Sequence, residues 1–372
     1  MLQGMSFKKI VIKIGTRVLT QKGNSLDAAQ IKNLVNQISA IVERGTQVVM
    51  VSSGAIGSGM GLLKLKQRPK ALSELQACAA VGQPHLMQAY DDLFKANSIL
   101  TAQVLLTQED LTDRKRYLNA KATLLALLSD RVVPVVNEND TVSTDEIRFG
   151  DNDKLSSLVA NLIEADLLIL LSNVDGLYKY DASKKGRELV SIVDKISGEI
   201  ESMARKGKDE LGTGGMVSKL QAVKIAADSG IPCIIANGKK ADVLIDIMEC
   251  KKTGTLFLPS SDKMAAKKRW LCFGAKSKGS IKVDDGAKEA LTKRHKSLLS
   301  SGIIGASGDF KKNDIVSVVG ADNKEFARGI VNYSSHDIDK IKGLKTAQIT
   351  KTIGHKQKDE VIHKDNLVIT EK

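Results

Sequence analysis

Short apolar runs alternate with longer amphipathic stretches over the first 260 residues of the chain. The runs are rich in Val, Ile and Leu, as the buried strands of a parallel sheet are. They span Lys8–Ile14, Gln47–Val51, Ile99–Leu106, Val132–Val136, Asp166–Leu171 and Pro232–Ala236. Pro and Gly fall mostly at the ends of these elements, where they interrupt regular structure. The alternation predicts an α/β fold with a doubly wound, mainly parallel sheet.

Between these runs, apolar residues recur every three or four positions, which predicts amphipathic helices. A capping box, Asp27-Ala-Ala-Gln30, opens the first helix, and Gly45 closes it at the C-cap position. Gly82-Gln83 separates the next two helices in this prediction. The later helices are expected at Leu72–Val81, Pro84–Lys95, Tyr117–Ser129, Lys154–Glu164, Leu220–Ser229 and Lys240–Glu249.

The character of the sequence changes near residue 260. Residues 261–275 are charged and are typical of a linker, and from Lys276 onward short apolar strands alternate with turns. This last part contains one clear helix, Gly286–Thr292. We therefore expect an α/β domain at residues 1–260, a linker at 261–275 and a small, mostly β domain at 276–372.

The stretch Val132–Asn161 carries the main candidate site. Its apolar strand ends in Asn137-Glu138-Asn139-Asp140, and Gly150–Lys154 (GDNDK) comes directly before a predicted helix. Open α/β sheets bind ligands at the carboxyl ends of their strands, and helix N-termini favour anions. Two such amide–carboxylate clusters suit the two ends of a small zwitterion. For Asp153, or its neighbours Asp151 and Asn152, an ordinary helix cap is the alternative.

Glycine-containing turns supply candidate phosphate contacts. Lys13-Ile14-Gly15-Thr16 ends the first strand, Ser52–Gly59 (SSGAIGSG) follows the second, and Leu211–Lys219 (LGTGGMVSK) precedes a helix. Glycine lets backbone N–H groups approach an anion, and lysine adds a point charge. P-loop spacing is absent, and as a dinucleotide fingerprint the second turn is weak. The alternatives are an exposed edge-strand lysine for Lys13 and a flexible loop with a helix cap for the last turn.

Composition excludes several classes of protein. Hydrophobic residues make up 42% and charged residues 27% of the chain, as in soluble globular proteins. No apolar run approaches the roughly 20 residues of a membrane span, and the N-terminus lacks the apolar centre of a secretory signal. The four cysteines are far apart and form no C-x-x-C pair. We therefore expect a cytoplasmic protein with reduced thiols and no membrane partner.

The net charge of +13 is uneven and raises the question of RNA as a partner. Residues 262–372 hold 23 Lys and Arg against 14 Asp and Glu, which is nine of the thirteen net positive charges. These basic residues are spread along the segment, and aromatic residues are only 3% of the whole chain. Because base-stacking surfaces need aromatic side chains, the pattern favours a structural or regulatory tail over an RNA-binding one.

Seven motifs resemble, in order and spacing, those of the glutamate 5-kinases in the amino acid kinase family. They are VIKIGT (Val11–Thr16), VSSGAI (Val51–Ile56), AAVGQ (Ala79–Gln83), VNENDTV (Val136–Val142), GDNDKLS (Gly150–Ser156), SNVDGLY (Ser172–Tyr178) and GTGGMVSK (Gly212–Lys219). The tail resembles a PUA domain through VDDGAKEAL (Val283–Leu291), SLLSSGI (Ser297–Ile303) and GDFKKNDIV (Gly308–Val316).

The resemblance implies an enzyme that phosphorylates the γ-carboxylate of L-glutamate with MgATP, opens proline biosynthesis, is inhibited by proline and forms a dimer or tetramer. Lys13 and Lys219 would balance charge on the transferring phosphoryl group, and Asp153 would orient both. The implied glutamate-binding residues are Ser53, Asn137, Asp140, Asp151 and Asn152. The implied ATP-binding residues are Lys13, Gly15, Ser172, Asn173, Thr213, Gly214, Gly215, Met216, Val217, Ser218 and Lys219, with Asn173 standing where the family often has Asp.

The chemistry of the residues agrees with this implication. A carboxylate acceptor is ionised at pH 7, so no general base is needed. Backbone N–H groups at Gly15 and Gly54 would join the two lysines in stabilising the equatorial oxygens. The sequence shows no compact set of carboxylates for a metal, so Mg²⁺ is expected to be held by phosphate oxygens and water rather than by protein ligands.

Three rival readings remain open at this point. A PUA-like tail with a basic charge is compatible with an RNA-binding or RNA-modifying protein. A nicotinamide dehydrogenase is disfavoured because the glycines are misplaced for its fingerprint. A related kinase acting on aspartate, acetylglutamate or carbamate shares the same backbone pattern.

Overall fold

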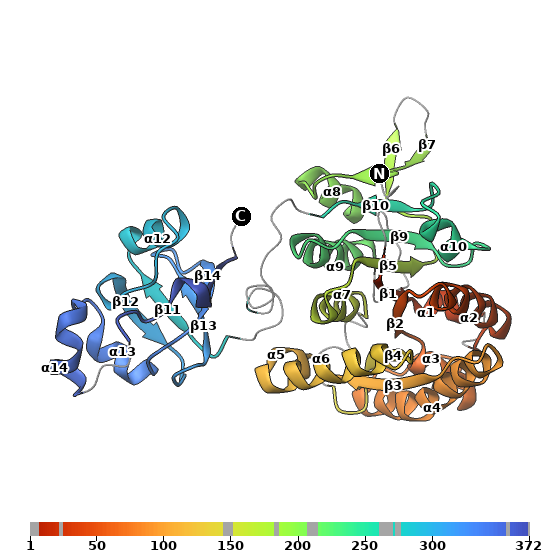
Figure 1. The fold of residues 1–372 in the computed structure, drawn as a ribbon, viewed down its shortest axis with the longest axis horizontal. Coiled ribbons are helices and arrows are strands. Elements are labelled where there is room, and N and C mark those ends of the chain that lie inside the picture. Colours follow the sequence, from red (N-terminus) through yellow and green to blue (C-terminus); the bar gives the residue numbers. More distant parts are fainter. Residues whose placement is uncertain are drawn as a thin grey trace. The chain divides into compact units, whose positions relative to one another are not determined.

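The computed structural model describes residues 7–21, 25–143, 152–181, 186–206, 215–259, 271, 277–354 and 358–370. The chain divides into two compact units (Figure 1). The first comprises Met1–Leu111 and Lys115–Lys263, and the second Thr112–Arg114 and Met264–Lys372. Each unit is described by itself.

The first unit is built on an eight-stranded sheet with the strand order β3-β4-β2-β1-β5-β9-β10-β8. The pairings β3–β4, β4–β2, β2–β1, β1–β5, β5–β9 and β10–β8 are parallel, and β9–β10 is antiparallel. The strands are β1 (Lys9–Ile14), β2 (Gln47–Ser52), β3 (Thr101–Leu106), β4 (Val133–Glu138), β5 (Leu167–Ser172), β8 (Ile192–Val193), β9 (Cys233–Asn237) and β10 (Thr255–Phe257). This confirms the mainly parallel α/β sheet.

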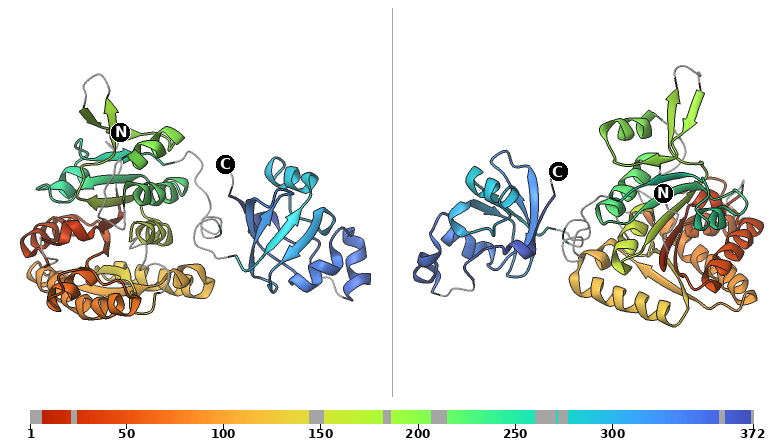
Figure 2. Two further views of the ribbon diagram at one scale, coloured as in Figure 1. Left: turned by 180° about the vertical axis from the view of Figure 1, so that it is seen from behind. Right: turned by 45° about the horizontal axis from the view of Figure 1, so that its top comes forward.

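Helices cover both faces of this sheet (Figures 1 and 2). They are α1 (Thr16–Leu19), α2 (Ala28–Glu43), α3 (Ala55–Leu62), α4 (Leu72–Ala96), α5 (Gln108–Thr112), α6 (Arg114–Ser129), α7 (Asn152–Ile163), α8 (Gly198–Lys206), α9 (Met216–Asp228) and α10 (Val243–Met248). A small hairpin, β6 (Tyr178–Asp181) with β7 (Gly186–Leu189), projects beside them. The helices α2 and α10 lie on one face, and α7 and α9 on the other.

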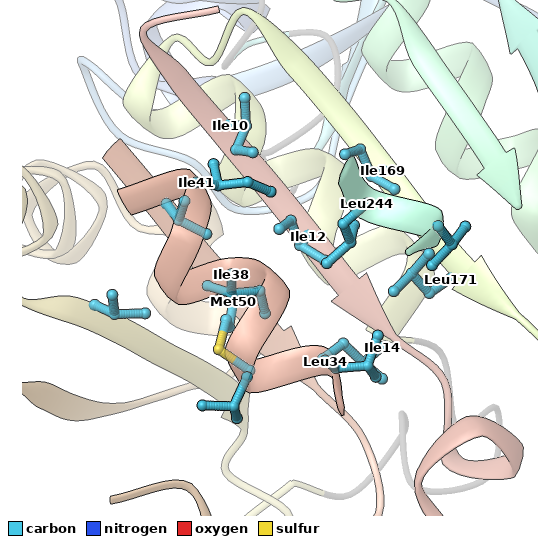
Figure 3. Packing of buried hydrophobic residues seen from close by; sticks show 14 of the residues in the cluster. Ile10, Ile12, Ile14, Leu34, Ile38, Ile41, Met50, Ile169, Leu171 and Leu244 are labelled. Carbon is cyan, nitrogen blue, oxygen red and sulfur yellow. The ribbon is translucent and has the colours of Figure 1, made fainter. Parts of the chain in front are cut away.

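Alternation along β1 explains how this arrangement serves both a core and a site. Ile10, Ile12 and Ile14 are buried against α2 and α10 in one apolar cluster (Figure 3). Successive side chains of a strand point to opposite faces. Lys13 therefore points to the other face, where α7 packs against β1. The chain places β2 on one side of β1 and β5 on the other, and ligands bind at such a reversal of strand order.

Some sequence predictions about the helices were wrong. Leu72–Ala96 is one helix with Pro84 inside it, not two helices separated at Gly82-Gln83. Glycine at position 82 allows close helix packing, because a Cβ on it would lie 1.9 Å from the Ala55 carbonyl oxygen of α3. Helices α3 and α4 thus touch backbone to backbone, and this contact outweighs the low helix propensity of Gly and Pro.

Helix α2 has one of the two hydrogen bonds of the predicted capping box. The Asp27 side chain accepts a hydrogen bond from the backbone N–H of Gln30 at 3.1 Å, as predicted. The Gln30 side chain instead donates to the Gly238 carbonyl at 2.6 Å, so it does not return to the cap. Arg44 occupies the C-cap position, and Gly45 follows it with a φ of +88°, the left-handed conformation that favours glycine. Helix α7 begins at Asn152, so Asn152 and Asp153 lie inside its first turn.

The second unit holds a five-stranded sheet of order β12-β11-β13-β14-β15, in which only β11–β13 is parallel. Its strands are β11 (Ser280–Val283), β12 (Ile303–Ser307), β13 (Ile315–Val319), β14 (Glu325–Ile330) and β15 (Leu367–Ile369). The sequence predicted one clear helix in this unit, α12 (Asp285–Thr292). The structure adds α13 (Ser335–Ile341) and α14 (Ile349–Ile353). Short 3₁₀ turns occur at Ser300–Gly302, Thr346–Gln348 and Lys364–Asn366. Among the described residues of the chain, no helix is long and apolar enough to cross a membrane.

Candidate active site

Lys13, Asp153 and Lys219 form a buried ion cluster. Lys13 Nζ lies 2.5 Å from Asp153 Oδ1, and Lys219 Nζ lies 3.1 Å from Asp153 Oδ2. Ser218 Oγ also donates to Asp153 Oδ2 at 3.3 Å. The aspartate is 1% exposed and each lysine 6%. Three elements supply the cluster: Lys13 comes from β1, Asp153 from the first turn of α7, and Lys219 from the first turn of α9, which packs on α7.

The charges of this cluster do not cancel. Burial disfavours the Asp153 carboxylate, but the Lys13 and Lys219 ammonium groups outweigh burial and hold the pKa of Asp153 below its usual value. One carboxylate between two ammonium groups leaves these three side chains with one net positive charge. A net positive charge in a protein interior favours an anionic ligand. A phosphoryl group carries the charge and the acceptor oxygens that would satisfy both lysines.

A second cluster, of amides and a hydroxyl, lies next to the first. Asn152 Nδ2 donates to Asn137 Oδ1 at 2.8 Å, to Ser53 Oγ at 3.1 Å and to the Ser52 carbonyl at 2.9 Å. Asn137 Nδ2 donates in turn to Gln83 Oε1 at 2.8 Å. These side chains come from the ends of β2 and β4, from α4 and from α7, and all are buried. We call Ser53, Gln83, Asn137 and Asn152 the amide cluster.

Successive residues join the two clusters. Asn152 belongs to the amide cluster and Asp153 to the ion cluster, and both lie in the first turn of α7. The strand ends that contribute to them, β1, β2 and β4, lie at the same edge of the parallel sheet. The structure therefore brings together six residues that the sequence analysis singled out: Lys13, Ser53, Asn137, Asn152, Asp153 and Lys219.

Asp140 lies in the turn after β4, beyond the amide cluster. Burial raises the pKa of Asp140 to about 6, and the positive charge of Arg68 partly opposes this shift. Within the described residues, no hydrogen bond joins Asp140 to the amide cluster. A carboxylate that is desolvated in this way is suited to pair with a cationic group of a ligand.

The residues predicted to contact ATP lie at the ends of β5 and at the start of α9. Ser172 is buried at the carboxyl end of β5, and Asn173, which follows it, is exposed. Gly215 is the N-cap of α9, and Met216, Val217 and Ser218 form its first turn. Val217 is 44% exposed, so the first turn presents an apolar surface beside Lys219. Asp151, Thr213 and Gly214 lie outside the described residues.

The backbone N–H of Gly15 makes a hydrogen bond within the sheet. Its N–H donates to the Leu171 carbonyl at 3.1 Å, which ties the end of β1 to β5. A Cβ at Gly15 would lie 3.2 Å from the same oxygen and 3.8 Å from Lys13 Nζ. Gly15 therefore permits the close approach of its backbone to the Leu171 carbonyl, with which its N–H is engaged.

Comparison with known proteins places the chain in a family. The profile of the amino acid kinase family matches residues 8–237, and that of the PUA domain matches residues 279–353. The chain belongs to the amino acid kinase family. It is 48% identical over 365 residues to the glutamate 5-kinase of Thermoanaerobacter sp. (strain X514), with 98% of each chain covered. It is 46% identical over 363 residues to the glutamate 5-kinase of Moorella thermoacetica, covering 97% of this chain and 96% of that relative.

Two solved structures align with about two thirds of the chain. Carbamate kinase from Giardia lamblia bound to AMP-PNP aligns with a TM-score of 0.48 and 19% identity over 68% of this chain and 99% of that chain. UMP kinase from Bacillus anthracis aligns with a TM-score of 0.46 and 15% identity over 69% of this chain and 98% of that chain.

The kinase also has polar contacts near the nucleotide candidates to which the sequence analysis gave no role. Asp175 binds Lys240 at 2.7 Å, accepts from the Tyr178 hydroxyl at 2.8 Å and from Asn237 Nδ2 at 3.3 Å. The Lys240 contact contributes most to lowering the pKa of Asp175. Ser172 is in register with Asn237, so this group lies at the same sheet edge. The motif SNVDGLY contains two of these residues, but sequence alone did not connect them with Lys240.

Carboxylate and histidine groups offer little to a metal ion here. Among the described residues, no three or more His, Cys, Asp or Glu side chains are grouped closely enough to hold one. Asp153 is already paired with two lysines.

Proposed function

We propose that this kinase transfers the γ-phosphoryl group of ATP to the γ-carboxylate of L-glutamate, forming L-glutamyl 5-phosphate, the first step of proline biosynthesis. The observation that carries the proposal is the pair of adjoining clusters. The ion cluster supplies positive charge for a phosphoryl group, and the amide cluster with Asp140 supplies donors and a carboxylate for an amino acid. The relatives that match over nearly the whole chain are named glutamate 5-kinases, which supports the same acceptor.

The proposed step needs no general base. A γ-carboxylate oxygen, ionised at pH 7, forms a bond to the γ-phosphorus of ATP, and the bond from that phosphorus to the bridging oxygen breaks. ADP leaves with the electron pair, and no proton is transferred. Lys13 and Lys219 contribute ammonium groups to the equatorial oxygens, and Asp153 holds both lysines in place. Preorganised charges of this kind stabilise developing charge without rearrangement.

Magnesium enters this proposal as part of the nucleotide substrate. Mg²⁺ prefers oxygen ligands and commonly keeps water and phosphate oxygens around it. Ser172, Asn173, Gly215, Met216, Val217 and Ser218 would hold the nucleotide, with Thr213 and Gly214 from the adjoining loop.

We also propose that the enzyme acts in the cytoplasm as a homo-oligomer and is inhibited by proline. Proline carries the same α-amino and α-carboxylate groups as glutamate, so it should compete for Asn137, Asp140 and Asn152. The proposed domain boundaries are residues 1–260 for catalysis, 261–275 for the linker and 276–372 for the PUA domain. All the proposed catalytic side chains belong to the first of these.

An acceptor panel tests the proposed activity. ADP release, coupled to a spectroscopic signal, is measured with L-glutamate, L-aspartate, N-acetyl-L-glutamate and carbamate as acceptors. We expect glutamate to give the highest kcat/KM. A clear preference for another acid in the panel would assign the site to a different carboxylate or carbamate kinase.

A truncation experiment tests the role of the PUA domain. A protein ending at residue 275 should keep its kinase activity, because the ion and amide clusters are complete without the tail. Nonspecific electrostatic RNA binding by the full chain, with a Kd of about 10⁻⁴–10⁻⁶ M, should weaken steeply with salt. Tight RNA binding at physiological salt together with an inactive truncated protein would favour an RNA-dependent function instead.

A further inference from the structure

Gln83 is the last side chain of the hydrogen-bonded chain that runs from Asn152 through Asn137. It lies in α4, is 8% exposed, and accepts the Asn137 Nδ2 hydrogen bond through Oε1 at 2.8 Å. Its other polar atom, Nε2, is buried and has no hydrogen-bond partner among the described residues. The amide therefore presents two unused N–H groups inside the candidate site.

The direction of the hydrogen bonds fixes which end of Gln83 is free. The Glu138 backbone N–H can only donate, and it donates to Asn137 Oδ1 at 2.9 Å. The Ser52 carbonyl can only accept, and it accepts from Asn152 Nδ2 at 2.9 Å. With both asparagines oriented by backbone groups, Asn137 Nδ2 must donate to Gln83, so Gln83 must offer its oxygen. Reversing the Gln83 amide would place two donors against each other.

A buried donor without an acceptor is unfavourable, and native structures rarely keep one unless a ligand or water satisfies it. The position of Gln83 indicates which group of the ligand it contacts. Asn152 adjoins Asp153, so the transferring phosphoryl group belongs near that end of the amide cluster, whereas Gln83 is two side chains further away. The acceptor group that Gln83 meets is therefore remote from the reacting carboxylate.

We infer that Gln83 Nε2 donates to the α-carboxylate of the acceptor amino acid and so distinguishes acceptors that carry this carboxylate from those that lack it. This inference rests on the proposed function, because it takes glutamate as the acceptor. Gln83 is then a substrate-binding residue that also orients Asn137. Both roles use one amide, since Oε1 serves the asparagine and Nε2 serves the substrate.

The packing of α4 keeps Gln83 in place for this role. The preceding Gly82 allows α4 to approach α3, because any Cβ there would lie 1.9 Å from the Ala55 carbonyl oxygen. Helix α3 itself begins directly after Ser53 and Gly54. The backbone contact therefore fixes the distance between Gln83 and the Ser53 side of the amide cluster.

The test compares Gln83→Met with three ligands of matched length. L-Glutamate has both carboxylates and the ammonium group, glutarate lacks the ammonium group, and 4-aminobutanoate lacks the α-carboxylate. Affinity is measured as kcat/KM, or as a competitive inhibition constant against glutamate where turnover is too slow. Gln88→Met, on the exposed face of the same helix where Gln88 bonds Asp92, is the control variant.

Gln83→Met should weaken the affinity for glutamate and for glutarate by roughly 10–100-fold, the scale of a lost hydrogen bond to a charged group. The affinity for 4-aminobutanoate and the KM for ATP should stay within about threefold of those of the unsubstituted enzyme, because neither ligand makes this contact. Gln83→Glu keeps the shape and brings a negative charge to the α-carboxylate, so it should weaken glutamate at least as much. It also provides a second measurement if the methionine variant folds poorly.

Two results would overturn the inference. Equal losses for all three ligands would mean that Gln83 acts only by orienting Asn137, and an unchanged glutamate KM in both variants would mean that Nε2 does not meet the substrate. Failure of the proposed function is distinguishable from these outcomes. If the proposed function fails, the unsubstituted enzyme will show no glutamate-dependent ADP release in the acceptor panel. The inference about Gln83 would then fail with it.

Discussion

Replacing Asp153 with Asn should destabilise the protein more than removing either of the lysines beside it. The substitution keeps the shape of the side chain but removes the carboxylate that Lys13 and Lys219, each 6% exposed, both contact. Lys13→Met, in contrast, leaves Asp153 paired with Lys219. The stability effects of the two substitutions should therefore differ in size, although both remove one charge from the cluster.

The distances give the scale of the effect. At an effective dielectric constant of about 20, unit charges attract by roughly 7 kcal/mol at the 2.5 Å of Lys13 and Asp153 and roughly 5 kcal/mol at the 3.1 Å of Lys219 and Asp153. Desolvation of three charges offsets most of this attraction. Breaking a buried pair costs about 3–5 kcal/mol, so we expect Asp153→Asn near the upper end and Lys13→Met below about 2 kcal/mol.

Urea unfolding followed by circular dichroism at neutral pH measures these differences. Asp246→Asn, which breaks an exposed ion pair with Lys251, should change stability by less than about 1 kcal/mol and serves as the control. Activity should separate from stability, because Lys13→Met should lower kcat by roughly 10²–10³-fold. A loss below about 1 kcal/mol for Asp153→Asn, or an equal loss for Lys13→Met, would refute the coupling of the three charges.

The pH dependence of stability provides an independent check. Folding lowers the pKa of Asp153, so its contribution is present above the ordinary value of 3.8 and is lost as the pH falls through the folded-state pKa. The unsubstituted protein should therefore lose this contribution only in acid, below about pH 4. The acid limb of the stability curve should be shallower for Asp153→Asn.

Three further predictions concern the acceptor site and its support. Asn137→Ala should raise the glutamate KM by roughly 10–150-fold with little change in the ATP KM, and a parallel rise in both would contradict its assignment to the acceptor end. Because burial raises the pKa of Asp140 to about 6, the glutamate KM should rise as the pH falls below that value and protonates the carboxylate that we propose as the partner of the α-ammonium group. Asp140→Asn should instead give a high KM that is flat with pH, and a persisting pH dependence would point to another group. Gly82→Ala should lower stability by roughly 3 kcal/mol through its collision with the Ala55 carbonyl, whereas Gly198→Ala, with open space around it, should be near neutral in chemical denaturation.

Much of the fold could be predicted from the sequence because burial of a parallel strand leaves a strong local signal. The run Leu167–Leu171 is apolar without interruption, the run Ile10–Ile14 is apolar except for Lys13, and both form central strands. The break predicted at Gly82-Gln83 failed because the reason for that glycine is a contact with α3, which no local pattern reveals. The helices α13 and α14 were missed because each is short and has few apolar residues.

The residues of the ion cluster could be singled out from their positions beside turns, but the pairing of Asp153 with both lysines was implied only by the resemblance to glutamate 5-kinases. Lys13 ends a strand, while Asp153 and Lys219 open helices that follow a strand or a glycine turn, and parallel topology brings such ends to one edge. Gln83 offered no such signal, since it lies within a helix and its partner Asn137 is 54 positions away. Lys240 was missed in the same way, because its pairing with Asp175 depends on the neighbouring positions of β5 and β9.

The first turn of α7 explains how one short segment can serve both ends of the site. Successive helical side chains project about 100° apart, so neighbours in sequence face different directions. Asn152 reaches Ser53 and Asn137, while Asp153 reaches Lys13 and Lys219. The distance between the acceptor end and the phosphoryl end is thus set by a rigid backbone turn and not by a flexible loop. A substitution at Asn152 should therefore act on the amino acid and one at Asp153 on the phosphoryl group, although the two residues are adjacent in the chain.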